Sequence, residues 1–350
     1  MKPSSRIFLT QAIAGPIAGC LWLAASLQAN AAETVGGGTL ENHAQGPAPA
    51  FALGGSGFVL VKNWDFGTNG TVRTMADMDE HFVYHDQWNT IGNGENYGAV
   101  MVASSAATVV PKQPVEGVDA PKVREFFPDS LRTYVVPLRG AKTLVPKEHN
   151  AGCGSFMAKW RLPRAGSLLG QDMIFETRVR FLGFPSFWFA IWNSGNEWVQ
   201  GAEIDVVEGF GWDKGNASNN FDGRYWHANA VPDRNDALKY KDWPTTMASR
   251  GVESFDAAQY HVWTLLYRAD DTYAIFLDGR PVQEGKLKWT IGAREDGAPI
   301  DMSFLFDATW AHTKIDQVNR PLDASALDGK YYEWDYSRVY LRPAASSPVR

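Results

Sequence analysis

Gly201-Ala202-Glu203-Ile204-Asp205-Val206-Val207-Glu208-Gly209-Phe210 is the stretch on which the interpretation of the whole sequence depends. Its carboxylates alternate with β-branched apolar residues, a composition typical of a strand. Because side chains alternate along a strand, Glu203, Asp205 and position 207 share a face, yet Val207 takes that place and the third acid follows one residue later. A β-bulge between Asp205 and Glu208 would bring all three acids to one face, and bulges are frequent beside active sites.

Three acids on one strand face repel each other and are costly to remove from water. A strand without a use for them would carry Ser or Thr. The alternative interpretation is a solvated polar face on an edge strand, which would suit two acids well. Glycines bracket this segment and a tryptophan-rich run precedes it, so we favour a catalytic strand. The motif Glu-Ile-Asp-Val-Val-Glu resembles the signature of family 16 of the glycoside hydrolases, in the bulged form of its laminarinase-, agarase- and carrageenase-type members.

The resemblance implies a role for each acid. Glycoside cleavage needs a proton for the leaving oxygen and a second carboxylate at the anomeric carbon. By resemblance, Glu203 is the nucleophile and Glu208 is the general acid/base. Asp205 lies between them, where it can hydrogen-bond to Glu203 and tune the charge of the set. Since clustered carboxylates cannot all ionise cheaply, one of them must hold its proton, which supports dividing the roles.

Spacing along the strand leaves the stereochemistry of the reaction open. Even with a bulge, Glu203 and Glu208 are four pleat steps apart, roughly 13 Å between their Cα atoms. Retention requires carboxyl groups about 5–5.5 Å apart, which a curved strand could deliver, whereas a flat strand would suit an inverting reaction at about 6.5–9.5 Å. It is the resemblance, and not the spacing, that implies retention.

Candidate substrate-binding residues flank the acids. Trp188 and Trp192 match the paired tryptophans of the family, and their spacing puts them on one strand face, where flat rings can receive sugar faces. Trp226 is a weaker candidate for the same cleft, and His227 matches a family histidine on the strand after the acids. Core packing is the alternative for each tryptophan. For the histidine, the alternative is an ordinary core or surface residue.

Asp335 is the one candidate metal ligand. It matches an aspartate that in many family members helps to hold a structural Ca²⁺ together with backbone carbonyls, although a lone Asp near a strand start is also a common turn former. The reaction that the resemblance implies needs no cofactor beyond this structural ion. The sequence has no Gly-rich phosphate loop, no Cys/His metal spacing and no Gly-x-Ser-x-Gly nucleophile elbow.

Short apolar or alternating segments recur along the chain with turn signals between them. The clearest is 173–181, with Phe175 and Val179 on one face and Arg178 and Arg180 on the other. The pattern predicts an all-β fold, a sandwich or jelly roll with two large, curved sheets. The resemblance implies a β-jelly-roll sandwich of two curved antiparallel sheets with an open cleft on the concave face. One short helix is expected at 75–82, and the other strands are expected at 58–64, 97–103, 131–138, 155–162, 187–192, 203–208, 224–230, 261–268, 272–277, 302–306 and 333–341.

The sequence divides into one domain and three flanking pieces. Residues 1–31 have the composition of a secretory signal, with Lys2 and Arg6 at the start, an apolar run and a small-x-small site at its end. The expected divisions are a signal peptide at 1–31, a flexible lead-in at 32–56, the catalytic domain at 57–343 and a C-terminal tail at 344–350.

The first cysteine suggests an alternative cellular location. Cys20 lies in a segment that resembles a bacterial lipoprotein box, which would make it a lipid anchor. The apolar run continues past Cys20, whereas lipoproteins usually turn polar there. We therefore favour cleavage near Ala31 and a secreted or periplasmic protein over lipid anchoring.

The charge balance narrows the choice of partners. The sequence carries 33 Lys and Arg against 39 Asp and Glu, a formal net charge of −6, and removal of 1–31 would make it more negative because that segment has two cations and no acid. An acidic chain is a poor match for nucleic acid or an anionic membrane. We expect a monomer acting on a polysaccharide. Cys153 would be the one remaining cysteine, so stability must come from a large core and not from a disulfide.

These observations predict an exported, endo-acting, retaining β-glycosidase. The substrate is expected to be a β-glucan with 1,3 or mixed linkages, or a galactan of the agar or carrageenan type, because family members share the acids across these substrates. A transglycosylase with the same residues is a second hypothesis. A carbohydrate-binding protein on the same fold is a third, but recognition relatives typically lack the glutamates that this chain keeps.

Overall fold

The computed structural model describes most of the expected domain. The described residues are 57–84, 123–138, 140–145, 151–160, 171–184, 187–195, 203–210, 226–230, 252, 255–286, 302–310 and 321–342. The expected signal peptide with Cys20, the lead-in, the strand at 97–103 and the C-terminal tail lie outside these residues. Within the described part of the chain, no helix has both the length and the apolar character needed to cross a bilayer.

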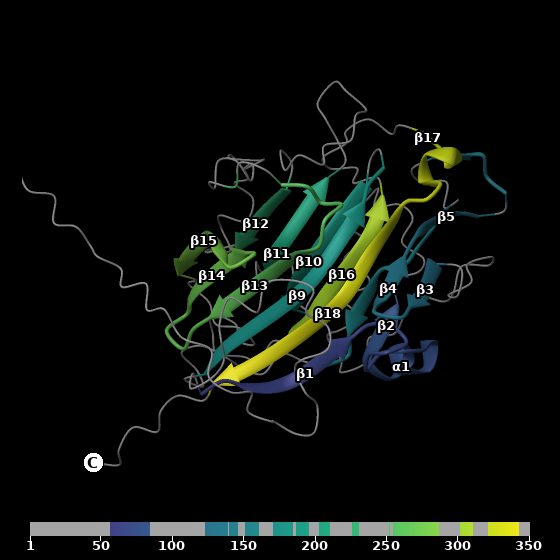
Figure 1. Ribbon diagram of the computed structural model, residues 1–350. Helices are drawn as coiled ribbons and strands as arrows, with labels where there is room; N and C mark the ends of the chain where they lie inside the picture. The colour runs from purple at the N-terminus through teal and green to yellow at the C-terminus, as the bar shows by residue number, and fades with distance from the viewer. Residues whose placement is uncertain are drawn as a thin grey trace, which may run out of the picture.

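Eight strands form one antiparallel sheet in the order β15-β14-β13-β9-β18-β4-β3, with β1 also paired to β18 (Figure 1). The long central strands β9 and β18 hold it together, pairing along almost their full lengths. The bounds are β1 Val59–Asp65, β3 Arg124–Phe127, β4 Ser130–Thr133, β9 Asp172–Leu182, β13 His261–Tyr267, β14 Thr272–Leu277, β15 Arg280–Lys286 and β18 Tyr331–Arg342.

Six strands form the second antiparallel sheet, in the order β12-β11-β10-β16-β8-β2. Their bounds are β2 Phe82–Tyr84, β8 Phe156–Ala158, β10 Phe187–Gly195, β11 Glu203–Phe210, β12 Trp226–Ala230 and β16 Met302–Trp310. Two small ribbons join β5 to β7 and β6 to β17. The remaining elements are α1 Met75–His81, β5 Val135–Pro137, β6 Thr143–Leu144, β7 Ala151–Cys153, β17 Leu322–Asp323 and the 3₁₀ helix η4 Ala324–Leu327.

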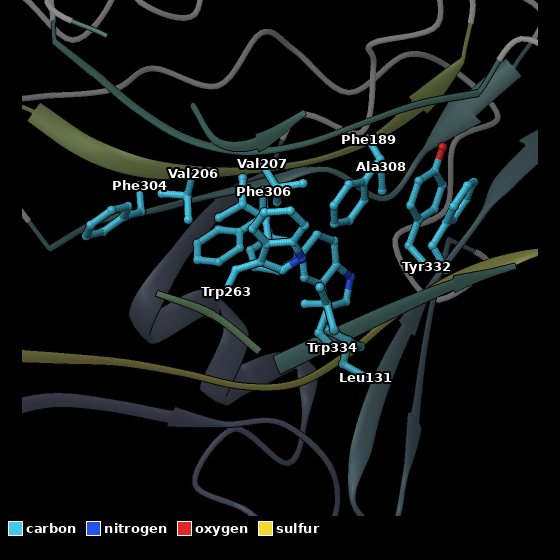
Figure 2. Close-up of a cluster of buried hydrophobic side chains, with 14 of the residues drawn as sticks. Leu131, Phe189, Val206, Val207, Trp263, Phe304, Phe306, Ala308, Tyr332 and Trp334 are labelled. Carbon is cyan, nitrogen blue, oxygen red and sulfur yellow. The ribbon is translucent and has the colours of Figure 1, made fainter. Parts of the chain in front are cut away.

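The hydrophobic core fills the space between the two sheets. Figure 2 shows aromatic side chains of both sheets facing each other across it. The rings of Phe175 and Phe304 stack with centroids 3.8 Å apart, and the ring of Trp334 lies 5.6 Å from those of Phe189 and Phe306. Aromatic pairs at such distances bury large apolar areas in specific geometries. The core thus fixes which face of each sheet is turned inward, and the predicted β-jelly-roll sandwich is confirmed.

Local turn chemistry determines how several elements begin and end. Asp278 and Gly279 form a two-residue hairpin between β14 and β15, and both have positive φ, 48° and 79°. This is the conformation that Asp-Gly favours in tight hairpins. Thr74 caps α1 in a reciprocal capping box with Asp77. Cys153 is buried in the core.

Two strand expectations were wrong in their extent. Residues 131–138 form the end of β4 and all of β5, which pair in different sheets, because the backbone N–H of Tyr134 leaves the ladder and donates to the carbonyl of Val123 at 3.0 Å. The strand expected at 155–162 is shorter, since β8 ends at Ala158. The N–H of Lys159 turns instead to the carbonyl of His81 at 2.8 Å.

Candidate active site

Strand β11 contains the expected bulge, and Val206 is the inserted residue. Against β10, Val207 pairs with Ile191 and Asp205 pairs with Trp192, so the register passes over Val206. The register against β12 shifts at the same place, between Asp205 and Glu208. Val206 and Val207 are both fully buried in the core, side by side (Figure 2). Two successive residues on the core side are the mark of a bulge.

The bulge restores an even spacing to the acids. On β10, Ser194 pairs with Glu203, Trp192 pairs with Asp205 and Ala190 pairs with Glu208. These three partners are every second residue of β10. Residues that face each other across an antiparallel ladder lie on the same face of the sheet. All three acids therefore occupy positions on the face turned away from the core, called here the acid-bearing face. In a regular strand Glu208 would have pointed into the apolar interior.

Two carboxylates of the acid-bearing face, those of Asp205 and Glu208, are largely removed from solvent. Asp205 is 4% exposed and Glu208 is 8% exposed. The six strands of this sheet, as the structure describes them, contain no Lys and no Arg. The described strands therefore bring carboxylates together on this face without bringing a cationic side chain beside them.

The predicted aromatic and histidine residues fall into two groups. Trp192 lies on the acid-bearing face directly opposite Asp205, and Trp188 occupies a position four residues away on the same strand. His227 pairs with Glu208 across β11 and β12. Trp226 pairs with Gly209, one residue out of step with the Glu208–His227 pair. Alternation therefore brings positions 188, 192 and 227 to the face of the acids and does not bring position 226 there.

Trp192 is more buried than an open sugar platform would be. Its side chain is 2% exposed, and its indole Nε1 donates a 2.8 Å hydrogen bond to the carboxylate of Asp307. The ring thus lies on the predicted face but is held within the structure. Its contact with substrate remains a prediction.

Asp307 on β16 is the functional candidate that sequence reasoning missed. Phe304, Phe306 and Ala308 belong to the core, so the alternating residue Asp307 lies on the acid-bearing face. It pairs with Ala190, which in turn pairs with Glu208. The signal in the sequence was an acid at an alternating position of a strongly apolar strand, but the predicted strand ended at Phe306.

The outer face of the eight-stranded sheet is built differently. Glu333 accepts hydrogen bonds from Arg132 at 3.0 Å, from Ser130 at 2.7 Å and from Arg180. Burial raises the pKa of Glu333, but the hydrogen bonds of Arg180 and Ser130 and the charge of Arg180 outweigh it and hold that pKa below its ordinary value. The guanidinium of Arg132 also stacks on the ring of Tyr331 at 4.0 Å. This paired set of acids and arginines is called here the arginine-bearing face.

Asp335, the candidate calcium ligand, belongs to this second face. It is the inserted residue of a bulge in β18, where the register against β9 shifts between Trp334 and Tyr336. Its carboxylate accepts a hydrogen bond from Arg178, and its backbone carbonyl accepts one from the N–H of Phe66 at 2.8 Å. Both kinds of oxygen that a Ca²⁺ site would use are thus engaged, and the guanidinium would repel a divalent cation.

The surroundings of Asp335 agree with that conclusion. Arg178 is fixed by stacking on the ring of Tyr260 at 4.1 Å. Among the described residues, no group of three or more His, Cys, Asp or Glu side chains is arranged to hold a metal ion. The residues present do not fit the structural Ca²⁺ that the family resemblance implies.

Comparisons with known proteins found similarity among solved structures. No family model and no curated protein matches the chain. An endo-1,3-β-glucanase from Streptomyces sioyaensis is 12% identical, covering 82% of this chain and 98% of its own, with a TM-score of 0.45. SCLam, a non-specific endo-β-1,3(4)-glucanase from family GH16, is 15% identical, covering 82% and 92%, with a TM-score of 0.45. An inactivated mutant of β-agarase B in complex with agaro-octaose is 13% identical, covering 79% and 89%, with a TM-score of 0.46.

The second of these structures comes from the family that the β11 motif resembles. All three TM-scores are below 0.5.

Proposed function

We propose that this chain is a glycoside hydrolase that cleaves internal β-linkages of a polysaccharide with retention. The observation that supports this best is the bulge at Val206, because it sends two valines into the core and brings Asp205 and Glu208 to the opposite face. A strand that served stability alone would gain nothing from gathering carboxylates in this way. The motif in which these acids occur resembles that of glycoside hydrolase family 16.

The proposed chemistry divides the work between the outer acids. Glu208 donates its proton to the glycosidic oxygen while the carboxylate of Glu203 attacks the anomeric carbon, so that the leaving sugar departs and a glycosyl-enzyme ester forms. Glu208, now ionised, then takes a proton from a water molecule whose oxygen attacks the same carbon and releases Glu203. Asp205 lies between them on the strand. In the proposed mechanism it hydrogen-bonds to Glu203 and so holds the nucleophile in place.

The distance between the outer acids limits this mechanism. Glu203 and Glu208 face Ser194 and Ala190, four residues apart on β10, a span of roughly 13 Å along a flat strand. Retention needs carboxyl groups about 5–5.5 Å apart. The proposal therefore includes a curved β11 whose outer side chains lean toward each other. An inverting reaction through water would be the outcome of a flatter strand.

The substrate is proposed as a β-1,3- or mixed-linked glucan or an agar- or carrageenan-type galactan. Trp188, Trp192 and His227 occupy positions on the face of the acids and are proposed to contact it. Endo action requires a cleft open at both ends over this face, and a polysaccharide too large to enter a cell requires export of the enzyme. Both belong to the proposal.

A substrate panel tests the proposed function. The purified chain is incubated with laminarin, lichenan, agarose and carrageenan, and the products are sized and counted as reducing ends. The Glu208→Gln variant serves as the blank for contaminating activity. We expect the unchanged chain to release oligosaccharides of several lengths from one of these polymers, with the blank inactive. Larger products formed from added oligosaccharides would identify a transglycosylase, and binding without any product would contradict the proposal.

A further inference from the structure

Asp307 shares a row of the sheet with the proposed acid/base. Glu208 on β11 pairs with Ala190 on β10, and Ala190 pairs with Asp307 on β16. The two acids are therefore two strand spacings apart, roughly 10 Å between Cα atoms. The residue between them carries only a methyl group. Asp307 thus belongs to the acid-bearing face by its position in the register, although it comes from a strand about a hundred residues later in the chain.

Asp307 is hydrogen-bonded to a residue of the neighbouring row, the row that contains Asp205. Its Oδ2 accepts the 2.8 Å hydrogen bond from Nε1 of Trp192, and Trp192 is the direct cross-strand partner of Asp205. Asp307 is 0% exposed and Trp192 is 2% exposed, so this bond lies away from solvent. Inside a protein a hydrogen bond is electrostatically stronger than it is in water. The indole is consequently held in one orientation on β10, the strand that pairs with β11.

The choice of an acid at this place calls for a physical reason. A fully buried carboxylate on a sheet that already carries three acids costs stability, and Leu or Val at position 307 would suit the apolar strand better. What the carboxylate adds over an apolar residue is a strong, directional acceptor for one N–H group. In a site whose rate depends on geometry, fixing the ring beside an acid can be worth that cost.

We propose that Asp307 is a positioning residue of the active site, acting through the indole N–H of Trp192 to hold that ring against Asp205. This inference rests on the proposed glycosidase function. Asp307 does not touch the reacting atoms. Its effect is to keep Trp192 from turning, so that Asp205, and through it the nucleophile Glu203, stays in its productive place.

The test compares four variants with the unchanged chain on the substrate found by the panel. Asp307→Ala removes the acceptor, Asp307→Asn keeps an acceptor oxygen, and Trp192→Phe keeps a ring but removes the donor. The fourth is the double variant Asp307→Ala/Trp192→Phe. Asp328→Ala, at the exposed end of η4, is the matched control for an Asp-to-Ala change.

We expect kcat of Asp307→Ala to fall roughly 10- to 100-fold with KM within about twofold, since the ring that moves adjoins the acids. Asp307→Asn should recover most of the loss. The double variant should be no slower than the slower single variant, because both changes break the same bond. Losses that multiply, a change confined to KM, or an Asn variant as slow as the Ala variant would each overturn the inference.

A second measurement does not depend on turnover. The ¹⁵N–¹H signal of the Trp192 indole is assigned by its disappearance in Trp192→Phe, and its exchange with solvent is followed. We expect strong protection in the unchanged chain and in Asp307→Asn, and exchange at least tenfold faster in Asp307→Ala. If Asp307→Ala does not fold, Asp307→Asn and Trp192→Phe carry the test, and equal kcat losses in these two would overturn the inference.

The two proposals fail in different ways. If the unchanged chain turns over no polysaccharide, the proposed function fails and takes the catalytic part of this inference with it. If the unchanged chain is active and Asp307→Ala loses indole protection without losing kcat, the inference alone is wrong.

Discussion

The two outer faces of the sandwich both carry buried acids, but the residues that surround those acids differ. Each carries buried acids beside a bulge, at Val206 in β11 and at Asp335 in β18. On the arginine-bearing face, Glu333 and Asp335 are bound by guanidinium groups that also stack on tyrosine rings. On the acid-bearing face, the described strands of the sheet supply Trp, Asn and His in place of Lys or Arg.

The surroundings of a buried carboxylate separate acids that stabilise the fold from acids that take part in chemistry. A carboxylate held by arginine keeps its charge and ties strands together, so it contributes to stability and has little capacity to exchange a proton. A carboxylate gathered with other acids and away from cations is costly to the fold and is retained where chemistry needs it. Substitutions on the arginine-bearing face should therefore lower the stability of the fold, and substitutions on the acid-bearing face should lower turnover.

The largest effect is expected from the outer acids of β11. Glu203→Gln and Glu208→Gln should each lower kcat roughly 10²–10⁴-fold, because the amide can neither attack the anomeric carbon nor exchange the proton. The free energy of unfolding should stay within about 1 kcal/mol of its original value or rise, since one of several clustered charges is removed. Reducing-end assays and urea titrations measure the two quantities. Glu284→Gln, exposed on β15, is the control for the same chemical change.

Full activity in either variant would remove that acid from the mechanism. A loss of activity that follows a loss of folded protein would place the acid with the structural set.

The opposite pattern is expected for Glu333. Its carboxylate is 3% exposed and bound by Arg132, Arg180 and Ser130. Glu333→Gln leaves two guanidinium groups without their counter-charge, which should lower the free energy of unfolding by about 3 kcal/mol. The kcat of the folded protein should stay within about twofold. A Gln variant as stable as the unchanged chain would show that the arginine-bearing face does not stabilise the fold in this way.

A smaller effect, with a distinct dependence on pH, is expected from Glu176 on β9. Burial raises its pKa to about 7, against the opposing influence of a 3.0 Å hydrogen bond from the hydroxyl of Tyr336 and of the charge of Arg338. The folded state thus holds a proton that the unfolded chain, with a pKa of 4.5, releases. The stability that this proton provides is complete below pH 4.5 and is lost as the pH rises to about 7.

Glu176→Gln should abolish this dependence, because the amide stays neutral and still accepts from Tyr336. At pH 8 the variant should be more stable than the unchanged chain by up to about 3 kcal/mol, and at pH 4.5 the two should be nearly equal. Urea titrations across this range provide the measurement. Unequal stabilities at the acidic end, or the same slope in both proteins, would refute the assignment to Glu176.

The sequence predicted what depends on local periodicity. The bulge followed from one acid that came a residue late, and the strand at 173–181 followed from alternation. The partners across strands did not follow, because they are set by register between distant segments. Arg178 and Asp335 are 157 residues apart, and Arg180 and Glu333 are 153 apart. Their pairing turned a candidate calcium ligand into part of an ion pair.

Asp307 was missed for the same reason. Its position in an apolar strand is visible in the sequence, but its relation to Glu208 requires two strand pairings through Ala190. The break between β4 and β5 at Tyr134 likewise depends on the carbonyl of Val123, the residue before β3, and not on residues 131–138 themselves.

The most direct test of the central claim is the anomeric configuration of the first product. The claim is that the bulge and the curvature of β11 bring Glu203 and Glu208 to bear on one sugar as nucleophile and acid/base. Proton NMR of the earliest product from a β-linked polysaccharide, recorded before mutarotation, distinguishes the mechanisms. We expect the β-anomer first, followed by slow appearance of the α-anomer. An initial α-anomer would mean inversion through water, with the two carboxyl groups about 6.5–9.5 Å apart, and would contradict it.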